Sequence, residues 1–120
     1  MDAPIPLPNI VLDDAQAKFI AEDCGDHRIY FDGPTDLMKL MVAGSLRLKA
    51  GMTPHPPHQH PEEEFMLVAS GTGEILCGDT TTQVGPGAVM YCAGDVVHNI
   101  VNTGPVPLTF YWSKWMAKGF

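Results

Sequence analysis

Short apolar segments divided by glycine-based turns are the feature that most restricts the fold of this 120-residue chain. Beyond residue 26 the helical spacing of apolar residues disappears, and segments that can form strands recur every 8–12 residues. The expected strands cover residues 27–31, 37–49, 64–70, 74–77, 80–84, 88–92, 96–101 and 108–115. Regular spacing of this kind is typical of an all-β sandwich or barrel, so we predict an all-β domain.

The first 25 residues differ from this pattern and are expected to pack on the barrel as an N-terminal arm with at most one short helix. Residues 1–11 are rich in proline, which favours an extended chain. Residues 12–20 combine apolar residues at helical spacing with acidic residues at the start, so this segment is predicted to form the short helix. Residues 26–120 then make up the barrel, and the length of the chain indicates a single domain overall.

The acidic charge balance excludes several classes of partner. The chain has 14 acidic and 7 basic side chains, a formal net charge of −7, and no cluster of lysine or arginine. Proteins that bind nucleic acids or anionic membrane surfaces need such a cluster. We therefore expect neither nucleic acid nor membrane as a partner, and a small molecule is the expected ligand.

Cysteine usage and the N-terminal sequence indicate a cytoplasmic protein. The three cysteines, Cys24, Cys77 and Cys92, are an odd number without a C-x2-C spacing, which disfavours a disulfide framework and a thiolate zinc site. Residues 1–8 lack the basic and apolar regions of a signal peptide. The longest uncharged stretch, residues 96–113, contains histidine, asparagine and proline and is no transmembrane helix.

Three histidines and one glutamate are the candidate metal ligands of the chain. His58 and His60 stand two residues apart in a proline-rich loop, Glu64 follows four residues later, and His98 lies in a later strand. Side chains at even spacing on an extended chain point to the same side, so the first three residues can face one metal ion. His98 can complete the set from another strand. Such ligands suit iron, manganese, nickel, copper or zinc and leave open positions at the metal.

These residues and the glycines around them resemble the two motifs of the cupin superfamily. The first motif runs G-x5-H-x-H-x3,4-E-x6-G, and this chain reads Gly51-x6-His58-Gln59-His60-x3-Glu64-x6-Gly71. The second runs G-x5-P-x-G-x2-H-x3-N, and this chain reads Gly87-x4-Cys92-Ala93-Gly94-x3-His98-x3-Asn102. The chain departs from the pattern by one extra residue before His58 and by Cys92 in place of proline, but the step from Gly87 to His98 matches. The resemblance covers roughly residues 40–115.

The resemblance implies a small single-domain cupin, with an antiparallel jelly-roll β-barrel that holds a metal inside one mouth. It implies one divalent transition metal per chain, which we expect to be iron, manganese, nickel or zinc. The ligands carried over from the motifs are His58, His60, Glu64 and His98. The parity of these residues on extended strands is compatible with the same four.

Further candidate site residues surround this set. Met66 has the parity of Glu64, and Ile100 and Asn102 have that of His98, so all three are expected to point into the barrel and wall the substrate pocket. Arg47 is a candidate anchor for a substrate carboxylate, because its planar guanidinium pairs with both oxygens. The weaker candidates for acid–base catalysis are Tyr91, Tyr111 and His55.

Outward-facing apolar residues indicate self-association. Phe65 and Leu67 alternate with Met66 and are expected on the outer face, against a second subunit or the N-terminal arm. The last strand, residues 108–115, carries two alternating sets of aromatic residues. One set should line the barrel and the other an interface, and the sequence leaves open which. We expect a homodimer.

Three functions remain open for such a site. The favoured one is a metalloenzyme that acts on a small oxygen-rich metabolite, as a lyase, isomerase or cyclase or as a dioxygenase. The second is a non-catalytic module that keeps its metal to bind or sense a metabolite. The third is a closed, inert structural metal site, which would be four-coordinate and tetrahedral.

Overall fold

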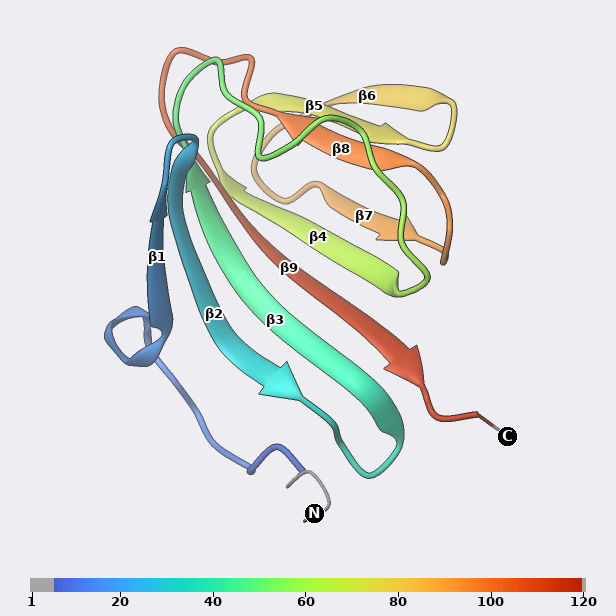
Figure 1. Cartoon of the computed structure of the whole chain (residues 1–120). Helices are drawn as coiled ribbons and strands as arrows, with labels where there is room; N and C mark the ends of the chain where they lie inside the picture. The colour runs from blue at the N-terminus through green and yellow to red at the C-terminus, as the bar shows by residue number, and fades with distance from the viewer. Residues whose placement is uncertain (1–5, 120) are drawn as a thin grey trace.

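The computed structural model describes residues 6–119, which form a two-layered and nearly all-β structure (Figure 1). One 3-10 turn precedes the strands. In order, the elements are η1 (Asp14–Gln16), β1 (Lys18–Glu22), β2 (Gly25–Gly33), β3 (Met38–Leu48), β4 (Glu63–Ser70), β5 (Gly73–Cys77), β6 (Thr80–Val84), β7 (Val89–Cys92), β8 (His98–Val101) and β9 (Leu108–Ala117). The all-β class predicted from the turn spacing is confirmed.

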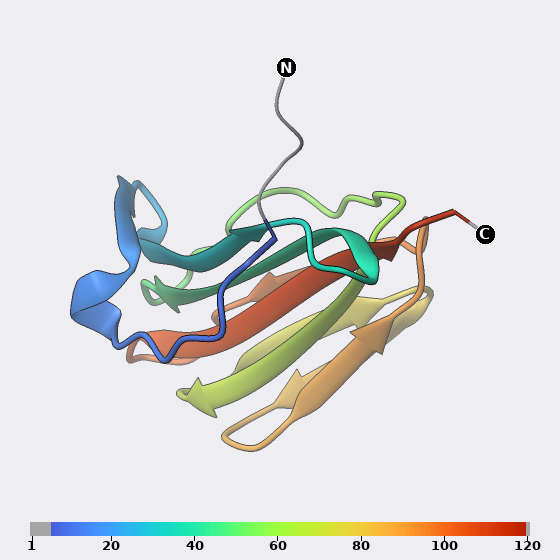
Figure 2. The ribbon, with the colours of Figure 1, turned by 90° about the horizontal axis from the view of Figure 1, so that it is seen from below.

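The strands form two sheets that face each other, as two views of the ribbon show (Figures 1 and 2). The larger sheet has the order β1-β2-β3-β9-β4-β7, and the smaller has the order β6-β5-β8. All neighbours are antiparallel. In the middle of the larger sheet β9 lies between β3 and β4, so the end of the chain joins the two halves of the sheet. This is the predicted jelly-roll arrangement.

The helix predicted over residues 12–20 is wrong. Only η1 is helical, and the Asp13 carboxylate caps it by accepting a hydrogen bond from the backbone N–H of Gln16 at 3.2 Å. From Lys18 onward the chain forms β1, whose residues pair with β2. A helix of two turns is marginal in water, whereas pairing with β2 satisfies the backbone of this segment.

The N-terminal arm runs along the β2–β3 hairpin. The backbone N–H of Leu7 donates a hydrogen bond to the carbonyl of Pro34 at 2.9 Å. Pro6 and Leu7 line a shallow hollow together with Phe31 and Met41. The first five residues of the predicted arm lie outside the described residues. Within residues 6–119, no helix has the length and apolar character needed to cross a membrane.

The core lies between the two sheets and follows the predicted alternation. On β4, Glu64, Met66 and Val68 are buried, whereas Phe65 on the opposite face is 36% exposed. The fully buried apolar side chains come from strands of both sheets and from the ends of β3 and β9: Leu48, Val68, Cys92, Ile100 and Leu108. The inner face is therefore continuous from the packed core to the site described next.

Candidate metal centre and pocket

Three histidines meet at one end of the space between the sheets. One ring nitrogen from each of His58, His60 and His98 lies within 4.8 Å of the others, a group that can hold a metal ion. The ring centroids of His58 and His60 each lie 4.8 Å from that of His98. His98 is 1% exposed, and the other two are partly exposed. The structure thus brings together residues separated by some forty positions in the chain.

Backbone contacts set the positions of these histidines. His58 and His98 form an isolated antiparallel bridge, in which each backbone N–H donates to the other's carbonyl at 3.2 and 2.9 Å. The carbonyl of His60 accepts from the N–H of Asp95 at 2.7 Å. A Cβ at Gly94 would lie 2.4 Å from the carbonyl oxygen of Pro61, so only glycine lets the β7–β8 turn approach the histidine loop this closely.

Glu64 lies among the histidines. Its side chain comes from the start of β4 and is directed inward, with 7% of the residue exposed. One carboxylate oxygen lies 3.1 Å from Nε2 of His60, and the other lies 3.5 Å from Nε2 of His98. The predicted residues His58, His60, Glu64 and His98 are therefore gathered in one cluster, which we call the His–Glu cluster.

Hydrogen bonds on the far side of two rings fix which nitrogen faces the cluster. Nδ1 of His60 lies 3.0 Å from the carbonyl of Glu62, and Nδ1 of His98 lies 2.9 Å from the carbonyl of Val96. A carbonyl accepts only from a protonated nitrogen, so both Nδ1 atoms carry hydrogen and Nε2 is left for the cluster. Such backbone anchoring is typical of metal-binding histidines.

The cluster shifts the pKa values of its members. Burial alone would raise the pKa of Glu64, but the neighbouring His98, aided by His60, outweighs burial and lowers it. The Glu64 carboxylate, 3.5 Å from Nε2, raises the pKa of His98 against the opposing effect of burial. Burial, with the positive charges of His55, His98 and His60, lowers the pKa of His58 to about 4. His58 is therefore neutral at pH 7, the form that binds metals.

The donor set fits a divalent transition metal. Nε2 of His98 is buried and has no hydrogen-bond partner among the described residues, although a glutamate oxygen lies nearby. An ion bound between the three ring nitrogens, which lie within 4.8 Å of one another, would satisfy this atom. Imidazole nitrogens beside a carboxylate are the ligands that iron, manganese, nickel and zinc accept.

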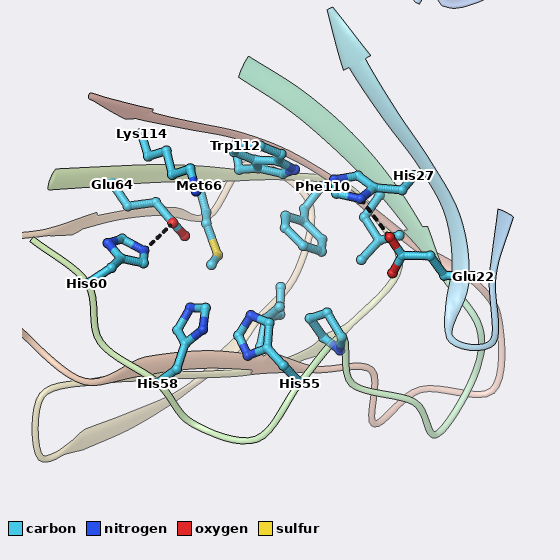
Figure 3. Close-up of a pocket in the computed structure, with 13 residues that line it drawn as sticks. Glu22, His27, His55, His58, His60, Glu64, Met66, Phe110, Trp112 and Lys114 are labelled. Carbon is cyan, nitrogen blue, oxygen red and sulfur yellow. Dashed lines mark hydrogen bonds and ion pairs between the residues drawn. The ribbon is translucent and has the colours of Figure 1, made fainter. Parts of the chain in front are cut away.

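A pocket of about 260 Å³ opens beside the cluster (Figure 3). Besides Glu64 and the histidines at positions 55, 58 and 60, its lining residues are Glu22, His27, Leu46, Pro54, Met66, Ile100, Phe110, Trp112 and Lys114. His55 stacks on His58 with ring centroids 3.6 Å apart, so it lines the pocket despite its opposite parity. Pro56 and Pro57 lie between them and interrupt the regular strand, so the alternation of side chains does not apply to His55.

The other sequence candidates divide between the pocket and the outer face. Met66 and Ile100 line the pocket. Arg47 is exposed on β3, between the buried residues at positions 46 and 48, and faces away from the pocket. Tyr91 and Tyr111 are 59% and 40% exposed on the outer face of the larger sheet, so the structure does not bring these three to the cluster.

Asn102 is buried, as its parity predicts, but it does not line the pocket. Its side-chain amide donates hydrogen bonds to the carbonyls of Leu48 and Val106, and its oxygen accepts from the N–H of Gly104. These bonds tie the β8–β9 turn to the end of β3. The residue therefore holds the fold, and the prediction that it walls the pocket is wrong.

The aromatic strand β9 resolves the choice that the sequence left open. Phe110 and Trp112 face inward and line the pocket, whereas Tyr111 faces outward. Trp115 donates a hydrogen bond from Nε1 to the Glu63 carboxylate at 3.1 Å. The Trp112 ring lies over Gly44, where a Cβ would come within 2.7 Å of it.

Cys92 contacts His98 of the His–Glu cluster on the Nδ1 side of its ring. Its Sγ lies 3.5 Å from Nδ1 of His98 and 3.4 Å from the carbonyl of Val96. Burial and the neighbouring Cys77 raise the pKa of Cys92 to about 11, so the thiol stays protonated at neutral pH. Cys92 is 1% exposed and packs as a small buried residue.

Sequence reasoning missed three polar residues of the pocket: Glu22, His27 and Lys114. Glu22 falls in the predicted arm and His27 in a predicted strand, and the sequence carries no signal of the β1–β2 pairing that brings the two together. Lys114 pairs with Glu64 in the register of β4 and β9 and makes an ion pair of 3.7 Å with Glu62. Its parity with Phe110 and Trp112 was the one available signal.

Comparison with known proteins agrees with this architecture. Residues 44–114, more than half of the chain, match the family model for the cupin domain. No curated protein sequence matches the chain.

Several solved structures share the fold across most of both chains. An RmlC-like cupin from Shewanella frigidimarina has 13% identity and a TM-score of 0.74, covering 92% of this chain and 94% of its own. KdgF from a Halomonas species has 16% identity and a TM-score of 0.72, with 89% and 94% covered. The polyketide cyclase RemF from Streptomyces resistomycificus has 20% identity and a TM-score of 0.72, with 90% and 80% covered.

Proposed function

The chain belongs to the cupin superfamily, and from this membership we propose that it is a metal-dependent enzyme that acts on a small, oxygen-rich metabolite. The observation that carries the proposal is the convergence of His58, His60 and His98 at the end of a pocket, with Glu64 beside two of them. A closed structural site would have no such pocket beside it. The modest size of the pocket, about 260 Å³, lies just below the usual range for ligand sites and favours a small substrate.

His58, His60, Glu64 and His98 are the proposed ligands of one divalent ion per chain, iron, manganese, nickel or zinc. The backbone anchoring of the His60 and His98 rings supports this set, because it leaves Nε2 free to bind metal. The position of Glu64 within 3.5 Å of both rings supports its inclusion. The bound ion would supply a Lewis acid that polarises substrate oxygens.

The residues around the proposed ion would bind the substrate and exclude water from it. Met66, Phe110 and Trp112 form an apolar wall that excludes water from the bound substrate. His55, stacked on His58 and in reach of solvent, is placed to bind a polar group of the substrate. Such a site serves non-redox lyase, isomerase or cyclase chemistry as well as dioxygenase chemistry. A polyketide cyclase shares this fold, so an activity screen should include substrates of non-redox enzymes.

The test is metal content by mass spectrometry on untagged protein, with turnover measured on a panel of small acids, enolisable ketones, catechols and sugar acids. We expect one metal ion per chain in the wild type, and loss of the ion in His58→Ala and His98→Ala. The matched control is His55→Ala, which removes a pocket histidine that lies outside the three-histidine group and should keep the ion. Full metal content in His98→Ala would refute the ligand set. Binding of panel members without turnover would instead indicate a metal-containing sensor module.

We also propose that the protein is a cytoplasmic homodimer. Phe65, Val89, Tyr91 and Tyr111 lie exposed on neighbouring strands of the larger sheet, where Phe65 pairs with Tyr91 and Leu67 with both Val89 and Tyr111. A second copy of the chain would bury this apolar surface. The three cysteines are all unpaired, which supports a reducing compartment.

A further inference from the structure

A carboxylate–imidazole pair lies in the same pocket as the His–Glu cluster but apart from it (Figure 3). Nδ1 of His27, on β2, lies 3.0 Å from a carboxylate oxygen of Glu22, the last residue of β1. In the hairpin register His27 is opposite Ile20 on one side and Leu46 on the other. Leu46 is buried and lines the pocket, so the His27 side chain faces inward with it.

The hydrogen bond to Glu22 determines the chemistry of the His27 ring. A carboxylate only accepts, so Nδ1 carries the hydrogen, and Nε2 is the ring nitrogen left to accept. The other oxygen of Glu22 accepts from the thiol of Cys24 at 3.7 Å, which holds the carboxylate from a second side. Glu22 therefore fixes the tautomer of His27, as second residues do for many functional histidines.

The free nitrogen of His27 is buried without a partner. Among the described residues, only two buried side-chain nitrogen or oxygen atoms lack a hydrogen-bond partner, Nε2 of His27 and Nε2 of His98. The second faces the proposed metal. A buried polar atom left unsatisfied is costly, so each such atom needs an explanation.

The surroundings of His27 are those of a binding site. The Trp112 ring lies 5.6 Å away between centroids, tilted by 50°, and Phe110 and Met66 lie between this end of the pocket and the metal end (Figure 3). These side chains offer flat apolar surface between two polar ends. The arrangement suits a molecule with oxygen donors at one end, a flat body, and a hydroxyl group at the other.

We infer that Glu22 and His27 form a second polar site of the pocket, which binds a hydroxyl group of a small, flat, metal-chelating substrate through Nε2 of His27. His27 contacts the substrate, and Glu22 is a positioning residue that acts through His27. This inference rests on the proposed function, because the pocket is taken as the substrate site. The second site narrows the proposed substrate to a hydroxylated aromatic or conjugated acid small enough for a pocket of about 260 Å³.

The experiment compares the binding of benzoate with that of 3-hydroxybenzoate, 4-hydroxybenzoate and 4-methoxybenzoate by titration calorimetry on zinc-loaded protein. We expect one hydroxybenzoate to bind about three- to tenfold more tightly than benzoate, the effect of one hydrogen bond. The methoxy compound, which has no hydrogen to donate, should gain nothing. In His27→Phe the advantage should vanish while the zinc content stays at the wild-type level.

Glu22 is tested by the tautomer of His27, measured by nitrogen NMR of the side chain. Wild-type protein should show hydrogen on Nδ1 only, and Glu22→Gln should show a mixture of tautomers and a smaller hydroxyl advantage. Asp23→Asn neutralises an exposed carboxylate in the same turn and should change neither.

Three results would overturn the inference: no hydroxybenzoate that binds better than benzoate, no binding of any probe, or an advantage that persists in His27→Phe. The same titrations on metal-free protein separate this inference from the proposed function. If the protein takes up no metal, yet the hydroxyl advantage depends on His27, the proposed function fails and the second site stands. If metal is bound and the advantage is absent, only the second site fails.

Discussion

Replacing Asn102 by alanine should destabilise the fold strongly and leave the metal site in place. The residue is 0% exposed and makes three hydrogen bonds, to the carbonyl of Leu48 at 3.0 Å, to the carbonyl of Val106 at 2.9 Å and from the N–H of Gly104 at 3.0 Å. Each bond contributes about 1 kcal/mol net, and a buried backbone group left without a partner costs at least as much. The expected loss in the free energy of unfolding is therefore about 3 kcal/mol.

The assay is urea denaturation of metal-free protein, followed by circular dichroism. The midpoint should fall while the slope of the transition stays unchanged, because the surface exposed on unfolding is the same. A loss of this size corresponds to a fall in Tm of about 10 °C for a domain of this length. Metal content per folded chain should match the wild type.

Two further variants make the test specific. Asn102→Asp keeps the acceptor for Gly104 but cannot donate to the two carbonyls, and it buries a charge, so it should be at least as destabilised. Thr103→Ala changes the neighbouring exposed residue and should stay within about 0.5 kcal/mol of the wild type. The reasoning is refuted if Asn102→Ala also stays within that limit, or if it loses metal while its stability is unchanged.

Three other variants give independent checks. Gly94→Ala places a Cβ 2.4 Å from the Pro61 carbonyl oxygen, so it should lower the free energy of unfolding by about 2 kcal/mol or more. It should also weaken metal binding at least tenfold, measured by competition with a chelator. Wild-type behaviour would mean that the β7–β8 turn does not hold the histidine loop. The fold lowers the pKa of His58 to about 4, so between pH 4 and 6.5 the unfolded chain binds a proton at this residue and the folded chain does not. The free energy of unfolding of metal-free protein should therefore fall by about 1 to 3 kcal/mol as the pH falls through that range. His58→Gln should show a correspondingly smaller loss in denaturation at the two pH values, and an identical loss would contradict the assignment. Phe65→Glu puts a charge in the exposed apolar surface and should convert a dimer to a monomer by light scattering at micromolar concentration; a wild-type protein that is already monomeric would refute the dimer.

The sequence predicted the parts of the structure that depend on alternation along a single strand. Glu64, Met66 and Phe65 lie on the predicted faces because successive side chains of a strand point to opposite sides. The motif spacing likewise brought the four cluster residues together. Both signals are local, or are carried by a resemblance that already contains the pairing of strands.

The sequence did not predict features that depend on which strands become neighbours. His27 faces the pocket because β2 pairs with β3, and Glu22 reaches His27 because β1, whose first three residues were expected in a helix, pairs with β2. Parity also failed where the chain is not a regular strand. His55 lines the pocket after two prolines, and Asn102 turns to the backbone of its own turn.

The position of the His–Glu cluster would couple metal binding to folding. His58 and His60 lie on the β3–β4 connection, His98 begins β8 in the smaller sheet, and Glu64 is the second residue of β4 in the larger sheet. An ion bound to all four would join both sheets and the β3–β4 loop, which is also held to β8 by the His58–His98 backbone bridge and by hydrogen bonds from the Thr53 hydroxyl. The unfolded chain cannot present these ligands together, so the ion would bind the native state and stabilise it by an amount that grows with its concentration. The Glu22–His27 pair lies within the larger sheet alone, so its ligand would add to binding at the pocket without joining the two layers.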